Sequence, residues 1–467
     1  MFRPVPEYAL NPFYWLGALA VVAFVIQGVT GMILLLYYIP TPTDAYSSTL
    51  YIFQSVSNGR FLETVHLYTA YAMIMLAFMH MMRGYFVSVH KRPREAMWLV
   101  GMLMGFVTLG FGFTGYLLPW TVVSKSATDV GVGMVTALPQ PISAVLNFLI
   151  VGGGGDSDEL LRFFDLHVVV LPAVLLVLLA VKMYMLEAHG VSEPASGAAP
   201  AAKQKLHPIF PDVTLYLFEL SLLFGAGMLL LSAVFPLTLP PAYTPAAAQT
   251  YTPQPDWYFL WIYQVLKISV FEGPSGLATA LSVVTLVFLA LILIPFLDRG
   301  SERRISRRPI YTTLGLVFIA EVIILSYWGY VTPGQVIPVE QATLVIGGTA
   351  LLIAVGSLLT YRMLYSRAKD KLVTAPSSLI PKTEIWTGVA FTTLVAAGAL
   401  FIGTTLNQIV SLAIGGLTFW GVAELAASLG AMGLVVFATA FLIYRLDLRT
   451  GTIRRRVALM EVGWNNE

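Results

Sequence analysis

The 467-residue sequence predicts an all-α polytopic membrane protein with about ten transmembrane helices. Hydrophobic residues make up 57% of the chain and charged residues 11%, whereas soluble proteins carry about 25% charge, so most of the chain cannot face water. Ten stretches reach the roughly 20 mostly apolar residues that a membrane helix needs. They run roughly over 15–38, 63–87, 97–118, 163–188, 214–236, 273–297, 311–331, 341–364, 385–405 and 421–444, and no alternation typical of barrel strands dominates.

Lysine and arginine predict the orientation of these helices. If the N-terminus is inside, the inner loops and the C-terminal tail hold the basic clusters around 91–94, 203–205, 299–308, 367–371 and 449–456. The outer loops hold few basic residues, namely Arg60, Lys125, Arg162 and Lys267. Because basic residues favour the cytoplasmic side, we expect a multi-pass protein of the cell membrane with both termini inside. Met1 to Pro12 does not resemble a cleavable signal peptide.

Composition also excludes several classes of site. The chain has no cysteine, which excludes disulfides, thiolate metal sites, cysteine-bound iron–sulfur clusters and c-type haem attachment within it. The net charge of +2 gives no support for nucleic-acid binding.

Two polar inner linkers divide the chain into three parts. We expect a four-helix unit over 1–190, a linker over 191–205 rich in Ala, Pro and Ser, a second unit over 206–366, a linker over 367–383, and a two-helix extension with a basic tail over 384–467. The long outer connections 119–162 and 237–272 are rich in Pro, Gly and aromatic residues, and ordered loops of that length are usually functional.

Histidines within two spans indicate haem ligands. His66 and His80 lie in the second span, 14 residues apart, which places them on nearly one helix face and about 21 Å apart along the axis. His167 lies near the outer end of the fourth span, which runs in the same direction, so it can face His66. Two imidazoles from different helices can hold a haem iron from both sides. We expect His90 and His207, in polar inner loops, to be surface residues.

Glycines repeat the same spacing on the neighbouring spans. Gly17 and Gly31 on the first span, and Gly101 and Gly115 on the third, are each 14 residues apart. Glycine lets a flat macrocycle approach the backbone, although small residues also let membrane helices pack closely. Two pairs with the histidine spacing favour two stacked haem sites in an N-terminal four-helix bundle.

Further motifs carry a resemblance to a known family. In chain order they are Gly17 with Gln27, Thr30 and Gly31; His66, His80, Arg83 and Gly84; Gly115-Tyr116-Leu117-Leu118-Pro119-Trp120; Arg162-Phe163-Phe164-Asp165-Leu166-His167; Pro255-Asp256-Trp257-Tyr258-Phe259; and Pro295-Phe296-Leu297-Asp298-Arg299-Gly300-Ser301-Glu302-Arg303-Arg304. In this order the chain resembles cytochrome b, the quinol-oxidising core subunit of cytochrome bc complexes, over about residues 10–330 with a fainter continuation to 365. The last motif is similar to the split chloroplast form.

The resemblance implies a mechanism and partners. Quinol is oxidised near the outer face, and one electron goes to a separate Rieske iron–sulfur protein. The second electron passes through two haems, of b or a type, to quinone near the inner face, with protons translocated outwards. The implied partners are the Rieske protein, the lipid membrane and a downstream cytochrome c, copper protein or terminal oxidase, within a dimeric complex or supercomplex.

The resemblance also implies residue roles. His66 and His167 match the outer-haem ligands, His80 matches one inner-haem ligand, and Arg83 accompanies the inner site. The quinol motif is Pro255, Asp256, Trp257 and Tyr258, with Asp256 and Tyr258 as catalytic residues and aspartate in place of the usual glutamate. Tyr116 is expected to line the same pocket. Asp212 matches an inner quinone-site carboxylate, although it could instead cap a helix. His189 is expected at the inner quinone site or on the surface.

The pattern departs from the family at three places. Lys182, 15 residues after His167, stands where the second inner-haem ligand is expected; a neutral lysine amine can ligate iron, whereas the alternative is that its ammonium reaches the inner surface. Glu63 stands where many relatives have an arginine near the outer haem propionates, for which Arg60 is a candidate substitute. The stretch 121–125 lacks the family's aromatic, Gly-containing continuation, which predicts a pocket for a different quinone.

Two other functions share part of this pattern. A di-haem membrane anchor of another respiratory complex would use the histidines but would not need the Pro255 to Tyr258 motif or Pro119-Trp120. A transporter with a buried His and Lys proton relay would leave the paired glycine spacing unexplained.

Overall fold

The computed structural model describes residues 4–138, 140–152, 155–192, 205–300, 302–303, 305 and 308–371. Within these residues, eight helices are long and apolar enough to cross a membrane. They confirm the first eight predicted spans. The predicted spans 385–405 and 421–444 lie outside the described residues. The chain falls into two compact units, one of Met1–Val5 and Pro12–Ile380 and the other of Pro6–Asn11 and Pro381–Glu467. The described helix of the second unit is the short η1 (Glu7–Leu10).

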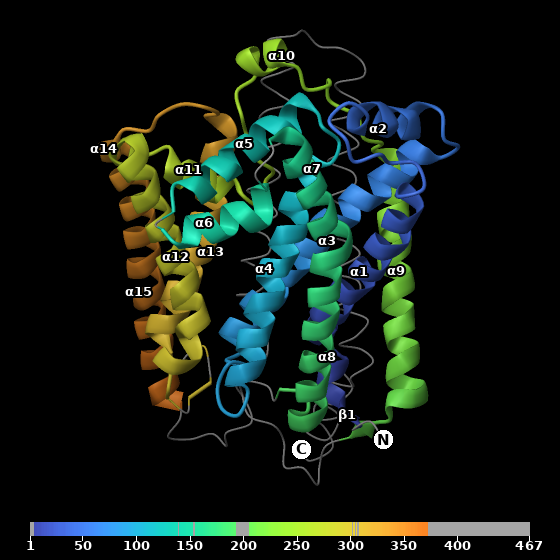
Figure 1. Cartoon of the computed structure of the whole chain (residues 1–467). Helices are drawn as coiled ribbons and strands as arrows, with labels where there is room; N and C mark the ends of the chain where they lie inside the picture. Colours follow the sequence, from blue (N-terminus) through green and yellow to red (C-terminus); the bar gives the residue numbers. More distant parts are fainter. Residues whose placement is uncertain are drawn as a thin grey trace, which may run out of the picture. The chain divides into compact units, whose positions relative to one another are not determined.

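The first four spans form a bundle. Their helices are α1 (Leu16–Leu34), α3 (Gly59–Phe86), α4 (Glu95–Leu117) and a composite of α7 (Asp156–Asp165), the π-helical turn η4 (Leu166–Val170) and α8 (Leu171–His189). α1 packs against α3, α3 against α4, and α4 against α8 (Figure 1). This arrangement agrees with the predicted four-helix N-terminal bundle.

The remaining spans follow in chain order. They are the π-helical η6 (Ile209–Val213) with α9 (Thr214–Val234), α12 (Gly273–Leu297), α13 (Pro309–Val331), and α14 (Val339–Ala342) continued by the π-helical η9 (Thr343–Gly347) and α15 (Gly348–Lys371). α9 packs on α1 and α3, and α13 packs on α15.

Short helices fill the long outer connections, which the sequence had marked only as functional loops. They are α2 (Ala45–Gln54), α5 (Val122–Thr136), α6 (Ile142–Leu146), η3 (Asn147–Val151), α10 (Pro245–Thr250), α11 (Leu260–Leu266) and η7 (Ser269–Phe271). In Figure 1 α2, α5 and α10 lie at the end of the bundle where α3 begins, which we call the outer end. Elsewhere stand η2 (Pro12–Tyr14) and the two-residue strands β1 (Val5–Pro6) and β2 (Leu206–His207).

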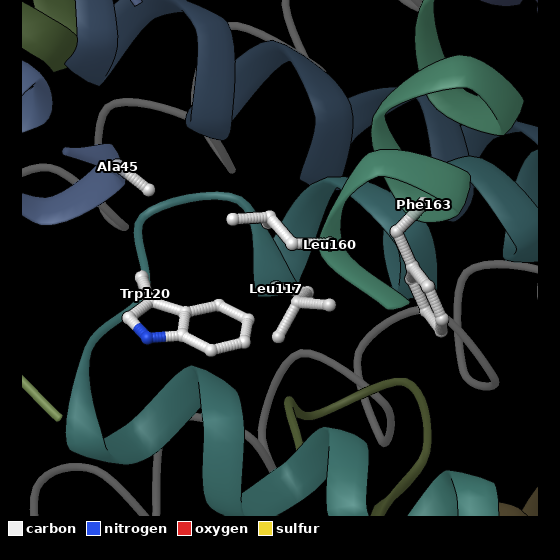
Figure 2. Close-up of a cluster of buried hydrophobic side chains, with 5 residues drawn as sticks. All are labelled: Ala45, Leu117, Trp120, Leu160 and Phe163. Carbon is white, nitrogen blue, oxygen red and sulfur yellow. The ribbon is translucent and has the colours of Figure 1, made fainter. Parts of the chain in front are cut away.

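A sharp corner follows α4 at the outer end. Trp120 adopts a left-handed backbone conformation with φ of 50°, which is rare for a bulky residue. Directly after it, Thr121 and Ser124 form a reciprocal capping box that starts α5. The corner is held by a buried cluster of Ala45, Leu117, Trp120, Leu160 and Phe163 (Figure 2). This cluster joins the end of α4 to α7 and so to the span that carries His167.

Candidate functional site

The outer pair of histidines lies across the bundle. The ring centres of His66 on α3 and His167 on η4 are 6.4 Å apart. Two imidazoles bonded to one metal at about 2 Å each place their ring centres about 6 Å apart, so this separation fits a single iron between them. A Cβ atom added at Gly31 would lie 3.3 Å from His66 Cε1, and one at Gly115 would lie 2.5 Å from His167 Cε1. The two outer glycines therefore make room for the two ligand rings.

Two threonines orient these rings. Thr30 Oγ1 lies 2.8 Å from His66 Nδ1, and Thr114 Oγ1 lies 3.1 Å from His167 Nδ1. Each threonine donates its own hydrogen to the backbone carbonyl four residues earlier, at 2.7 and 2.8 Å. Each hydroxyl can therefore accept the Nδ1–H of its histidine, which leaves both Nε2 atoms as free ligands.

The inner pair is built differently. A Cβ atom at Gly17 would lie 3.0 Å from His80 Cε1, and one at Gly101 would lie 3.0 Å from Lys182 Nζ. Each inner glycine therefore adjoins the side chain that the sequence had paired with it. The Nδ1 of His80 is buried and has no hydrogen-bond partner. The inner histidine thus lacks the hydroxyl support found at the outer pair. Close by in sequence, the Arg83 guanidinium stacks 3.8 Å from the ring centre of Tyr14.

An aromatic cluster surrounds Asp256 ahead of α11. Its carboxylate accepts hydrogen bonds from the hydroxyls of Tyr71, at 3.0 Å, and Tyr258, at 3.4 Å. The Trp257 ring meets both tyrosine rings edge-on. A Cβ atom at Gly112 would lie 2.8 Å from the Tyr258 hydroxyl, so α4 approaches this tyrosine closely. The cluster brings together α3, α4 and the loop before α11.

The Asp256 carboxyl is tuned for proton transfer near neutral pH. Burial raises its pKa to about 6, while the hydrogen bonds from Tyr71 and Tyr258 act in the opposite direction. Tyr116 is close enough for the Asp256 charge to act on its hydroxyl. Three predicted residues, Asp256, Tyr258 and Tyr116, are therefore gathered at one place. The structure adds Tyr71, which the sequence had not singled out.

A buried lysine fixes the wall beside this cluster. Lys125 on α5 pairs with Asp129, with Asp156 at 3.3 Å and with Glu159 at 3.6 Å. Its ammonium also lies 5.6 Å from the centre of the Trp120 ring. The stretch 121–125, which departs from the family pattern, thus replaces aromatic packing by an ion-pair network that ties α5 to α7.

At the inner end, Asp212 lies in η6 and its Oδ2 atom is 3.5 Å from His207 Nδ1. Asp212 does not cap α9, because Val213 stands at the N-cap. His189 is exposed at the end of α8, with Nδ1 2.8 Å from the Met185 carbonyl. Asp212 and His189 are thus not joined by a described hydrogen bond or ion pair.

The expectation that His90 is a surface residue is wrong. Its side chain is fully buried, and Nε2 lies 3.1 Å from Asp298 Oδ2. Lys91 reaches the other oxygen of Asp298 at 2.9 Å, and Arg308 pairs with the same carboxylate. Burial lowers the pKa of His90 to about 4, so it is neutral at physiological pH. The inner loop folds over because this network joins the loop after α3 to the end of α12 and the start of α13.

The charged residues near the outer haem position also differ from the expectation. Arg60 donates to the backbone carbonyl of Leu237 at 2.6 Å, so it is engaged with the loop after α9. Glu63 is half-buried on α3 and acts electrostatically on Tyr38. No ion pair between Arg60 and Glu63 occurs among the described residues.

Comparison with known protein families covers most of the described chain. The family model described as cytochrome b(N-terminal)/b6/petB matches residues 71–245, and the model described as cytochrome b(C-terminal)/b6/petD matches residues 244–349.

Individual relatives agree with these matches. The chain is 36% identical over 334 residues to the cytochrome bc complex cytochrome b subunit of Chlorobaculum thiosulfatiphilum, covering 70% of this chain and 76% of the relative. It is 31% identical over 418 residues to cytochrome b of Sulfolobus acidocaldarius, covering 82% and 72%. Among solved structures it is similar to a chain of a hyperthermophilic respiratory Complex III, with a TM-score of 0.62 and 26% identity over 77% of this chain and 91% of that chain.

Proposed function

Because the chain belongs to the cytochrome b family and is the membrane-embedded subunit of a quinol-oxidising bc-type complex, we propose that its Asp256 cluster binds quinol and accepts a quinol proton. The observation that carries this proposal is the Asp256 carboxylate held between the hydroxyls of Tyr71 and Tyr258. Trp257 and Tyr116 complete the aromatic surroundings, which suit a flat ring.

The protonation behaviour of Asp256 supports this role. With a pKa of about 6 its carboxylate is ionised at neutral pH, yet it is a stronger base than an exposed aspartate. General bases work best when their pKa lies near the operating pH. Tyr71 and Tyr258 hold the carboxylate in place, and the proton that it accepts is released towards the outer side.

We assign the outer haem to His66 and His167 and the inner haem to His80 and Lys182. The support is the ring separation at the outer pair and the position of each glycine against a ligand side chain. Haems of b or a type bound there would supply one-electron transfer across the membrane. The protein's part is to fix the ligands about 21 Å apart along α3.

The position of the Lys182 amine supports ligation over a surface location. Its Nζ lies against Gly101, well within α4 and on the same side of the bundle as the other ligand contacts. A lysine whose ammonium reached the inner surface would instead extend towards the end of α8 at His189.

The proposal includes partners beyond this chain. A Rieske iron–sulfur protein takes the first electron of each quinol, and a cytochrome c, copper protein or terminal oxidase follows it. Asp212 contributes to a quinone site at the inner end, where His207 pairs with it. His189 and Arg83 are further candidates at this end, and the complex is dimeric with both termini of this chain inside.

Replacing Asp256 by Asn tests the proton-acceptor role. Quinol oxidation should fall by about 10²- to 10⁴-fold, the usual contribution of a general base, while the haem spectrum stays intact. The wild-type rate should decline as pH falls through about 6, because a protonated carboxyl cannot accept a proton, and the Asn variant should lack this decline.

Matched controls define the result. Asp256→Glu should keep most of the activity, because it keeps the carboxylate. Glu272→Gln removes an exposed carboxylate in the same outer connection and should leave the rate unchanged. Wild-type turnover of Asp256→Asn at all pH values would refute the role.

A further inference from the structure

An acidic side chain lies at the centre of the membrane in the second half of the chain. Glu321 stands midway along α13, and Thr349 stands midway along the span Val339–Leu359 that packs against it. Glu321 Oε1 and Thr349 Oγ1 are 2.6 Å apart. A second polar contact joins the same helices nearer the inner end, where Thr313 Oγ1 lies 2.8 Å from Ser357 Oγ. The mechanism above uses neither pair.

The hydrogen bonds around Thr349 need one more hydrogen than Thr349 supplies. Its hydroxyl lies 2.5 Å from the Val345 carbonyl as well as 2.6 Å from Glu321. A hydroxyl has a single hydrogen but can accept from other donors. If that hydrogen goes to the Val345 carbonyl, the contact with Glu321 is satisfied only when the carboxyl donates a hydrogen of its own.

The second oxygen of Glu321 leads to the same conclusion. Oε2 is buried and has no hydrogen-bond partner among the described residues. No described ion pair includes Glu321. An unpaired carbonyl oxygen of a neutral acid is tolerated far better in a membrane than an unpaired oxygen of a charged carboxylate.

We propose that Glu321 is a proton-binding site within the bilayer, held as a neutral carboxylic acid that donates to Thr349 and thereby joins α13 to α15. Its ligand is a proton. Its chemical signature is reactivity towards apolar carbodiimides, which require a protonated carboxyl in an apolar setting. The site is separate from Asp256 and does not depend on the quinol mechanism.

The test labels the whole complex in its native membrane with dicyclohexylcarbodiimide. The acid proton moves to one nitrogen of the reagent while the carboxyl oxygen bonds to its central carbon. The resulting O-acylisourea rearranges to a stable N-acylurea. Nothing leaves, so the modified peptide gains the full mass of one reagent molecule. Peptide mapping by mass spectrometry separates labelling at Glu321 from labelling at Asp256.

We expect the label on the Glu321 peptide, and its loss in Glu321→Gln. The exposed Glu340, which lies in water at the start of α14, should stay unlabelled by the apolar reagent, and Glu340→Gln should leave the Glu321 label unchanged. An intact wild-type complex without label at Glu321 would overturn the proposal.

A second measurement does not depend on access of the reagent. Infrared spectra of wild type minus Glu321→Gln should show the carbonyl stretch of one protonated carboxyl. A difference spectrum with the bands of an ionised carboxylate instead would overturn the proposal, even if labelling occurred. Haem absorbance reports that both variants assemble.

Discussion

The outer and inner ligand pairs occupy the same four helices but are supported differently. Outside, His66 and His167 each have a threonine hydroxyl at Nδ1, and both threonines directly precede a glycine that faces the ligand. Inside, Leu16 and Val100 precede the corresponding glycines, and the Nδ1 of His80 is buried without a partner. The outer rings are therefore oriented by hydrogen bonds, whereas the inner ligands are positioned by contact with α1 and α4.

The difference shows what a second ligand of another type requires. A lysine amine has a single nitrogen at the tip of a flexible chain, so it needs space and has no second ring atom for a threonine to orient. Substitutions in the two pairs should therefore differ in the size and kind of their effects.

The largest effect should follow from removing an outer ligand. His66→Ala or His167→Ala leaves one axial position without its imidazole, so we expect complete loss of the outer haem from the absorbance spectrum. His80→Ala should remove the inner signal and leave the outer signal. If both outer variants kept the full outer-haem spectrum, the ligand assignment would be rejected.

Lys182→Ala should have the next largest effect. Without its amine the inner iron loses one axial bond, so we expect loss of the inner haem or conversion to a high-spin spectrum, with the outer haem unaffected. Lys182→His should restore a low-spin signal of bis-imidazole type. A density map with water at the sixth position of the wild-type inner iron would contradict the proposed ligand.

Replacing the glycines by alanine compares the two pairs at one methyl group each. Gly115→Ala places Cβ 2.5 Å from a His167 ring atom, so the ring must shift, and we expect strong loss of outer haem. Gly101→Ala meets the mobile end of Lys182 at 3.0 Å and should be milder. Haem content per chain measures both, and equal losses would show that helix packing decides the outcome. Gly225→Ala on α9, which meets nothing within 4 Å, is the control.

The smallest effect should follow from Thr114→Val, which keeps the shape of the side chain but removes the acceptor at His167 Nδ1. Loss of such a support typically weakens metal affinity about 10- to 100-fold. We expect a shifted outer-haem potential and retained inner-haem potential in a redox titration. Thr108→Val on the same helix, whose hydroxyl bonds only to the Met104 carbonyl among the described residues, should leave both unchanged.

The sequence predicted the parts of the site that follow a helical period. The eight described spans and the four ligand–glycine contacts depend on apolar length and on the 14-residue spacing, both of which are local properties of a helix. Tyr71 was missed because its role arises from a contact with Asp256, 185 positions away. A tyrosine five residues after His66, in mid-span, was the available signal.

The buried position of His90 was missed for a related reason. A polar loop beside several basic residues has the composition of a solvated surface. Its burial depends on Asp298 and Arg308, which come together only when α12 and α13 are in place. The short outer helices were missed because Pro and Gly obscure their period, as in the corner around Trp120.

The π-helical turn η4 accounts for an apparent mismatch in ladder height. Each π turn takes in one residue more than an α turn, because its hydrogen bonds run to i+5 instead of i+4. η4 lies between His167 and Lys182, so their 15-residue separation advances the chain by much the same rotation as the 14 residues from His66 to His80. Shortening this wide turn by a single amino acid would swing Lys182 by about 100° relative to His167 and turn its amine away from the rung that it shares with His80.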